Sequence, residues 1–241
     1  YRVALGERAK GAGGVRQLIL DGERQTLARY PNVDASQPVS GGWAFADGKA
    51  WPMYAEIPGE DKHTLKVLAS DWRSWAKPGE VEVMVFPRFN WWNSRARVKS
   101  VDGESRTVTL ASDCSYAIRK GDRYFFQNAL EELDSPGEWY ADASEGMLYF
   151  WPPEGGKAEN ASVVVAATLL SLEKGAQDIV WKGFTMEGCN GNAVVMQGAV
   201  RCILESNWIR NVGEWAGGGV NISGGDSDRL AYNIIEKVGR T

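Results

Sequence analysis

Hydrophobic and polar residues alternate with a period of two in many short runs, and in the last third of the chain these runs repeat. Three segments can be superimposed there: Leu170–Asn190, Val194–Gly213 and Val220–Gly239. A repeat of this length, made of short alternating runs separated by glycine, is typical of a solenoid of strands rather than of helix pairs. The alternation therefore predicts parallel β-helix coils for residues 154–241.

Equivalent positions of the three segments carry residues of matching character. The predicted inward positions are Ile179, Trp181, Phe184 and Met186, then Cys202, Leu204, Asn207 and Ile209, then Asp228, Leu230, Asn233 and Ile235. A buried amide is costly unless it is paired, so we expect Asn207 and Asn233 to hydrogen-bond to each other along the stack. Outward positions place Glu187 beside Arg210 and Lys182 beside Glu205, and opposite charges on neighbouring strands stabilise such a register.

The remaining alternating runs predict antiparallel strands. Residues 1–69 read as strands and loops associated with the coils, with a hairpin around Asp21–Arg24 and a surface loop at residues 35–50. Residues 70–153 contain several short runs joined by turns such as Asp102-Gly103, which is typical of a small antiparallel β barrel or sandwich inserted into the β-helix. The predicted fold class is therefore all-β.

Composition narrows the classes of function. The chain has 241 residues, a net charge of −4 and no cluster of Lys and Arg, which argues against nucleic acid or an anionic membrane as a partner. No apolar run is long enough to span a bilayer. A single histidine and three cysteines without metal-ligand spacing leave no metal or cofactor site predicted. The oligomeric state stays open.

The two ends of the sequence are informative about the length of the protein and its compartment. The chain starts at Tyr1 without a signal peptide, and its last coil has no capping element before Thr241. We therefore expect the coils to continue beyond this segment in a longer, secreted or periplasmic protein, and the 241-residue segment alone to be inactive.

Two motifs resemble those of a known family. They are the run Asn128–Tyr140, which includes Leu-Asp-Ser-Pro-Gly-Glu-Trp-Tyr, and the run Gly146–Pro153; Gly22–Asn32 and the pattern around Phe86–Trp92 are similar too. Together they resemble bacterial right-handed parallel β-helix proteins of the family 141 glycoside hydrolases, which carry a small β insertion domain. The resemblance implies a carbohydrate-active protein that cleaves plant or microbial polysaccharide.

Glycoside hydrolysis requires two carboxylates, and residues in the same position of adjacent coils lie about 4.8 Å apart, which suits such a pair. Two alternatives to a hydrolase remain open. One is a polysaccharide lyase with a Lys or Arg base and Ca²⁺, and the other is a non-catalytic carbohydrate-binding or structural β-helix fragment. For a hydrolase, a catalytic pair beyond Thr241 is a further alternative.

The candidate catalytic residues are Asp226 and Asp228, in the glycine-rich turn Gly224–Arg229. Asp228 occupies a predicted inward position, so it must be paired, and Arg229 is a candidate partner as well as a candidate substrate ligand. An acid, base or Ca²⁺ ligand is one reading of this turn. The alternative is a structural turn in which the carboxylates accept backbone N–H groups.

The sequence is rich in tryptophan, with eleven residues, and aromatic faces stack on sugar rings. The insertion Gly213–Gly219 predicts an exposed loop that presents Trp215. Trp91 and Trp92 are the candidates for substrate binding in the insertion. Any of these rings could instead fill a core.

Overall fold

The computed structural model describes residues 1–7, 14–37 and 40–240, and it confirms an all-β protein. Within these residues, the only helical segments are three single 3₁₀ turns: η1 (Ala69–Asp71), η2 (Pro78–Glu80) and η3 (Leu130–Glu132). The chain forms two compact units. We call residues 1–25, 141–148 and 155–241 the coil unit, and residues 26–140 and 149–154 the antiparallel unit.

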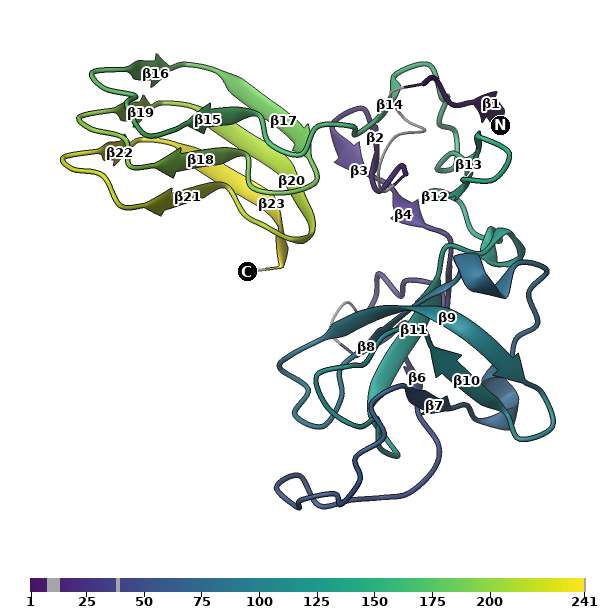
Figure 1. Cartoon of the computed structure of the whole chain (residues 1–241). Coiled ribbons are helices and arrows are strands. Elements are labelled where there is room, and N and C mark those ends of the chain that lie inside the picture. Colours follow the sequence, from purple (N-terminus) through teal and green to yellow (C-terminus); the bar gives the residue numbers. More distant parts are fainter. Residues whose placement is uncertain (8–13, 38–39, 241) are drawn as a thin grey trace. The chain divides into compact units, whose positions relative to one another are not determined.

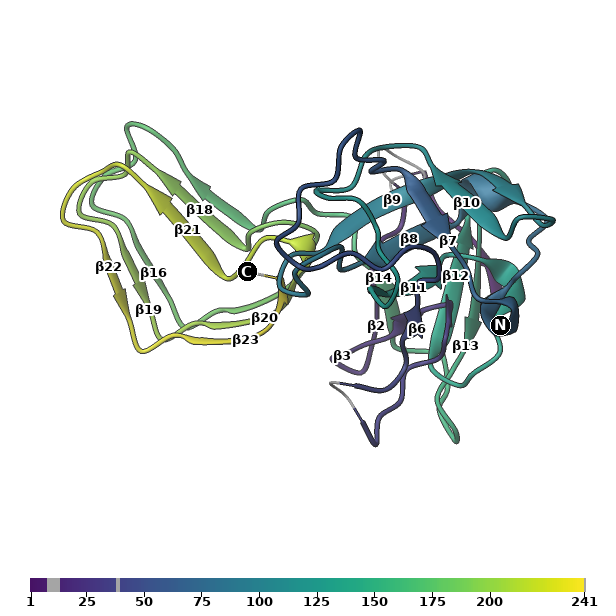
Figure 2. The same ribbon diagram turned by 90° about the horizontal axis from the view of Figure 1, so that it is seen from below.

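Three successive coils make up most of the coil unit (Figure 1). Their strands are β15 (Leu170–Leu172), β16 (Val180–Lys182) and β17 (Thr185–Cys189), then β18 (Val194–Gln197), β19 (Ile203–Glu205) and β20 (Trp208–Ala216), then β21 (Val220–Ser223), β22 (Arg229–Ala231) and β23 (Ile234–Arg240). Each coil gives one strand to each of three parallel sheets, of orders β15-β18-β21, β16-β19-β22 and β17-β20-β23. Figure 2 shows these sheets as three sides around a common core.

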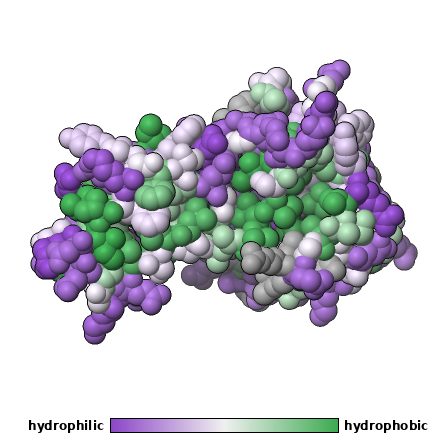
Figure 3. Space-filling view, turned by 90° about the horizontal axis from the view of Figure 1, so that it is seen from above, coloured by the Kyte–Doolittle hydropathy of each residue, from purple (hydrophilic) through white to green (hydrophobic). Residues whose placement is uncertain are grey.

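The pairing register is the one that the repeat predicts. Trp181 lies beside Leu204, which lies beside Leu230, and Met186, Ile209 and Ile235 line up in the same way. Alternation with a period of two points these side chains inward. Those of the middle coil are almost fully buried, with Leu204 and Ile209 each 1% exposed, whereas Leu230 and Ile235 of the third coil are 40% and 43% exposed. Phe184 of the first coil holds a predicted inward position but is 47% exposed, because a terminal coil has a neighbour on one side only. Val180 is exposed because the alternation points it outward, and Figure 3 shows apolar side chains among polar ones on that face.

Four further short strands belong to the coil unit. β2 (Leu18–Leu20) pairs antiparallel with both β3 (Glu23–Arg24) and β14 (Ala161–Val163). The hairpin is therefore tighter than predicted, because Asp21 and Gly22 both adopt positive φ and form a two-residue turn. β1 (Arg2–Ala4) lies beside the Ala141–Leu148 segment, where Leu5 N–H donates to Gly146 O over 2.8 Å.

The antiparallel unit is built around one sheet of seven strands. They are β5 (Arg29–Tyr30), β6 (Ala44–Phe45), β7 (Thr64–Lys66), β8 (Glu82–Val85), β9 (Ser94–Asp102), β10 (Thr107–Leu110) and β11 (Arg123–Gln127). Their order is β5-β11-β8-β9-β10-β7, and β6 also pairs with β11. Asp47 N–H, just after β6, donates to Lys66 O in β7 over 2.9 Å, so the sheet curves back on itself toward a barrel.

The core of this unit lies inside the curved sheet. Tyr124 and Phe126 of β11 are fully buried against Leu65, Val83 and Val108. The hairpin β9–β10 around Asp102-Gly103 agrees with the sequence pattern. Residues before position 70 supply β5, β6 and β7, so the sheet uses more of the chain than residues 70–153.

A second hairpin joins β12 (Glu138–Asp142) to β13 (Met147–Trp151), and β4 (Thr26–Leu27) pairs parallel with β12. The carboxylate of Glu138, 2% exposed, accepts the N–H groups of Asp134 and Ser135 at 3.2 Å each. This contact holds the Ser-Pro-Gly turn in place, which gives the Glu of the Leu-Asp-Ser-Pro-Gly-Glu-Trp-Tyr motif a structural role.

Candidate functional site

The turn that carries Asp226 and Asp228 lies between β21 and β22 of the third coil. Asp226 is exposed and pairs through its backbone with Val200 of the coil before it. Asp228 is half-buried, and its Oδ1 accepts the N–H of Cys202 over 2.8 Å. A Cβ on Gly225 would lie 2.3 Å from Ala199 O, so the turn packs directly on the preceding coil. The structure thus brings both carboxylates to one turn, and it gives Asp228 the backbone partner expected of a structural turn.

Arg229 does not pair with Asp228. Its Nη2 lies 2.6 Å from Oε2 of Glu205, and Lys182 bonds to the other oxygen of the same carboxylate. Lys182 first, and then Arg229, hold the pKa of Glu205 below its ordinary value. The three side chains form a charge ladder across the coils, which confirms the predicted contact between Lys182 and Glu205.

Trp215 lies at the end of β20, not in an exposed loop. The prediction of a loop for the insertion was wrong in part, because residues 213–216 continue the strand with a register shift between Val212 and Ala216. Trp215 is half-buried. Beside it, Glu214 Oε1 and Arg16 Nη2 form a partly buried ion pair of 2.9 Å.

Trp91 and Trp92 are exposed on the segment between β8 and β9, at 70% and 46%. The ring of Trp91 lies 6.1 Å from that of Phe89, which in turn packs edge-on against Tyr116 at 5.1 Å. Both rings are therefore accessible at the surface and do not fill a core. Their role in substrate binding stays a prediction.

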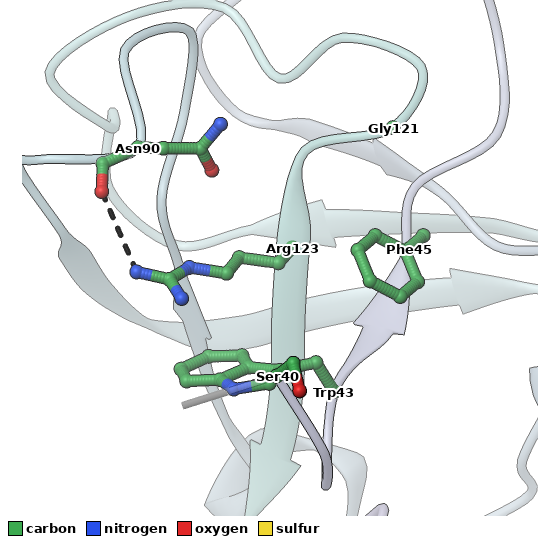
Figure 4. A pocket seen from close by; sticks show the side chains of 6 residues that line it. All are labelled: Ser40, Trp43, Phe45, Asn90, Gly121 and Arg123. Carbon is green, nitrogen blue, oxygen red and sulfur yellow. Dashed lines mark hydrogen bonds between the residues drawn. The ribbon is translucent and has the colours of Figure 1, made fainter. Parts of the chain in front are cut away.

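A hollow of about 350 Å³ lies in the antiparallel unit, and Asn90, which directly precedes Trp91, is one of its lining residues. Its lining residues are Ser40, Trp43, Phe45, Asn90, Gly121 and Arg123. This volume is at the lower end of the range for small-molecule sites. Figure 4 shows the Arg123 side chain reaching across the indole of Trp43 toward Asn90, with Phe45 at the other side.

Aromatic rings hold the guanidinium of Arg123 in this hollow. Its Cζ lies 4.7 Å from the ring centroid of Trp43 and 4.2 Å from that of Phe86. Trp43 is fixed in turn by Phe86 and Phe125, at 5.5 and 5.3 Å between ring centroids. Strands β6 and β11 position the whole group, since Trp43 precedes β6 and Arg123 opens β11.

The sequence analysis missed this hollow because residues 35–50 read as a loop. Ala44 and Phe45 instead form β6. The signal was present as a short alternation: Ala44 and Ala46 are buried, whereas Phe45 between them is 47% exposed and lines the hollow with Trp43. In such a strand the small residues face the core and the large rings face out.

Two features are absent from the described residues. No three Asp, Glu, His or Cys side chains in residues 1–7, 14–37 and 40–240 gather closely enough to share a metal ion. No helix in this part of the chain has the length and apolar character needed to cross a membrane.

One part of the chain matches a known protein family. Residues 69–153 match the GH141 insertion domain. A solved structure described as a glycoside hydrolase resembles the whole fold, with a TM-score of 0.54 over 92% of this chain and 14% sequence identity. The match covers 50% of that structure, so the present chain spans half of its length. No curated protein matches the sequence.

Proposed function

We propose that this chain is part of a glycoside hydrolase that cleaves plant or microbial polysaccharide outside the cytoplasm. The observation that carries the proposal is the match of residues 69–153 to the GH141 insertion domain. The stacked three-sheet coils and the fold likeness to a glycoside hydrolase support it. We propose that the coils wind as a right-handed parallel β-helix, since a strand that crosses over to a parallel neighbour in the same sheet does so in the right-handed sense in nearly all proteins.

In this proposal paired carboxylates carry out the reaction. Asp226 and Asp228 are the candidates within the described residues: one would protonate the leaving oxygen, and the other would act as base or nucleophile. Exposure of Asp226 supports its access to a substrate. The bond from Cys202 N–H to Asp228 supports a positioning or structural role for that residue at the same turn.

The experiment compares the 241-residue chain with the product of the complete gene on a panel of plant and microbial polysaccharides. We expect the complete product to release reducing ends without the ultraviolet absorbance of unsaturated uronates, and the 241-residue chain to release none. Unsaturated products would favour the lyase. Binding without cleavage by the complete product would overturn the proposal in favour of a non-catalytic module.

The assignment of residues is tested by Asp226→Ala and Asp228→Ala in the complete product. Asp178→Ala is the matched control, because Asp178 is also an exposed turn carboxylate and pairs with Arg201 at 2.6 Å. Loss of turnover in the first two variants, with both variants folded and the control active, supports the assignment. Normal turnover in both would move the catalytic pair elsewhere.

A further inference from the structure

The hollow at Trp43 contains a cation without a carboxylate partner. Among the described residues, the side chain of Arg123 makes one hydrogen bond, from Nη2 to the backbone carbonyl of Asn90, and at 3.4 Å this bond is long. Arg123 forms no ion pair with any described residue, and its buried Nε has no hydrogen-bond partner there. Since an arginine fork binds carboxylates through two parallel bonds, this guanidinium has unused capacity for an anion.

The charged lining of the hollow is positive. Its lining residues include Arg123 and no Asp or Glu. The nearest carboxylate along the chain, Asp122, is occupied: it is buried, lies 3.1 Å from Arg119 Nη2 and accepts the N–H of Arg88 over 2.9 Å. A second cation, Arg29, lies behind the lining, with its Cζ 3.7 Å from the ring of Phe125 and 5.8 Å from that of Trp43.

The remaining lining suits a sugar. Trp43 and Phe45 supply aromatic faces, and Phe45 is 47% exposed. Ser40 adds a hydroxyl, which donates to Gln37 Oε1 at 3.3 Å, and Asn90 adds a side-chain amide, which bonds to no described residue. A flat aromatic surface, two neutral polar groups and one fork-shaped cation match a pyranose ring that carries a carboxylate.

We propose that this hollow is a binding site for an acidic sugar residue, a uronate, on the antiparallel unit. The guanidinium of Arg123 binds the carboxylate, and Trp43 with Phe45 packs against the ring. The choice of a sugar rests on the proposed function, whereas the requirement for an anion rests on Arg123 alone. The site serves binding and not cleavage, since its lining contains no acid or base.

The test is calorimetric or NMR titration of the 241-residue chain with trigalacturonate and with its methyl ester, which keeps the rings and removes the charges. We expect trigalacturonate to bind at least about tenfold more tightly than the ester, and Arg123→Gln to weaken its binding roughly 10- to 100-fold. The matched control is Arg97→Gln, an exposed arginine of the same unit outside the hollow. It should leave the affinity unchanged.

A second pair of variants tests the aromatic contribution. Trp43→Phe keeps a ring in the packed group and should weaken binding, and Trp151→Phe, an exposed tryptophan of the same unit, should not. Unfolding temperature and the NMR spectrum establish that each variant is folded, so a loss of binding in folded Arg123→Gln is attributed to the lost guanidinium.

Several outcomes would overturn the proposal. They are absence of binding, equal affinity for the acid and its ester, equal weakening by Arg97→Gln, and preference for a sulfated galactan oligosaccharide over trigalacturonate. The titration measures binding and not cleavage. The proposed hydrolysis can therefore fail while this site stands, and the site can fail while reducing ends are still released.

Discussion

The side-chain amide of Asn207 donates to Oδ1 of Asn233 on the next coil over 2.9 Å. The same amide also donates to Trp181 O on the coil before, at 3.0 Å, and Oδ1 of Asn207 accepts Phe184 N–H at 3.0 Å. One side chain thus links three successive coils. Because Asn207 is 2% exposed, these bonds lie out of reach of water and help to fix the register of the stack.

Replacing Asn207 by Ala should therefore be strongly destabilising. The change leaves Phe184 N–H and Trp181 O without their partner, and each buried unsatisfied group costs about 1–3 kcal/mol. We expect the free energy of unfolding of the coil unit to fall by roughly 3 kcal/mol, measured by urea denaturation. Asn221→Ala, an exposed asparagine of β21, is the control. Equal effects of the two substitutions would contradict the role of the ladder.

Gly225 should be irreplaceable in the turn before Asp226. Its φ is +89°, and a Cβ would lie 2.3 Å from Ala199 O and 2.9 Å from Oδ2 of Asp228. Strained backbone of this kind costs on the order of 1–3 kcal/mol, and the clash adds to it. Gly225→Ala should therefore lower the melting temperature by several degrees, whereas Gly218→Ala, where a Cβ meets nothing within 4 Å, should not. A fully stable Gly225→Ala protein would show that the coils are spaced differently.

Asp228 should contribute more to stability than Asp226. Its Oδ1 accepts the N–H of the buried residue Cys202, and a hydrogen bond to a charged group contributes about 1.5–3 kcal/mol. The exposed Asp226 should change the free energy of unfolding by less than about 0.5 kcal/mol when replaced by Ala. Denaturation of Asp228→Ala and Asp226→Ala measures the difference. An inverted order would contradict the structural reading of the turn.

The repeat predicted the coils well because two independent constraints act on the same positions. Alternation of two decides which side chains point inward, and stacking then requires matched neighbours, as with Trp181 and Leu204 or Lys182 and Glu205. The hydrogen bond between Asn207 and Asn233 was predicted from the cost of burying an unpaired amide. Local pattern was therefore sufficient wherever neighbours in space are one repeat apart in sequence.

The antiparallel unit was less predictable because its contacts join distant segments. Thr26 and Leu27 directly follow the predicted hairpin around Asp21–Arg24, but they pair with Glu138 and Trp139, more than a hundred positions away. The partner of a short strand is chosen by packing that a single sequence does not display. The hollow was missed for the same reason: Trp43 and Arg123 are eighty positions apart, and only the pairing of β6 with β11 brings them together.

Stability should depend on pH through Glu138. Burial raises the pKa of Glu138 to about 7, against the opposing effect of the N–H groups that its carboxylate accepts. Because the folded state keeps this proton at a higher pH than the unfolded chain does, the contribution is fully present below the ordinary pKa of 4.5 and is lost as pH rises through about 7. The loss amounts to at most about 3 kcal/mol.

Glu138→Gln should remove this part of the pH dependence and make the antiparallel unit more stable than the wild type at pH values above 7. Glu104→Gln, an exposed glutamate of the β9–β10 turn, should leave the pH profile unchanged. Urea midpoints measured from the ordinary pKa of 4.5 to pH values above 7 test this. A wild-type protein that becomes more stable as pH rises over that range would contradict the assignment.

The claim that the protein is a hydrolase is tested most directly by cleavage of a polysaccharide by the complete gene product in heavy-oxygen water, with mass analysis of the new ends. Hydrolysis by paired carboxylates adds one labelled oxygen to each new reducing end. We predict one label for each cleaved bond. Products that carry an unsaturated uronate and no label, or no products at all, would contradict the claim.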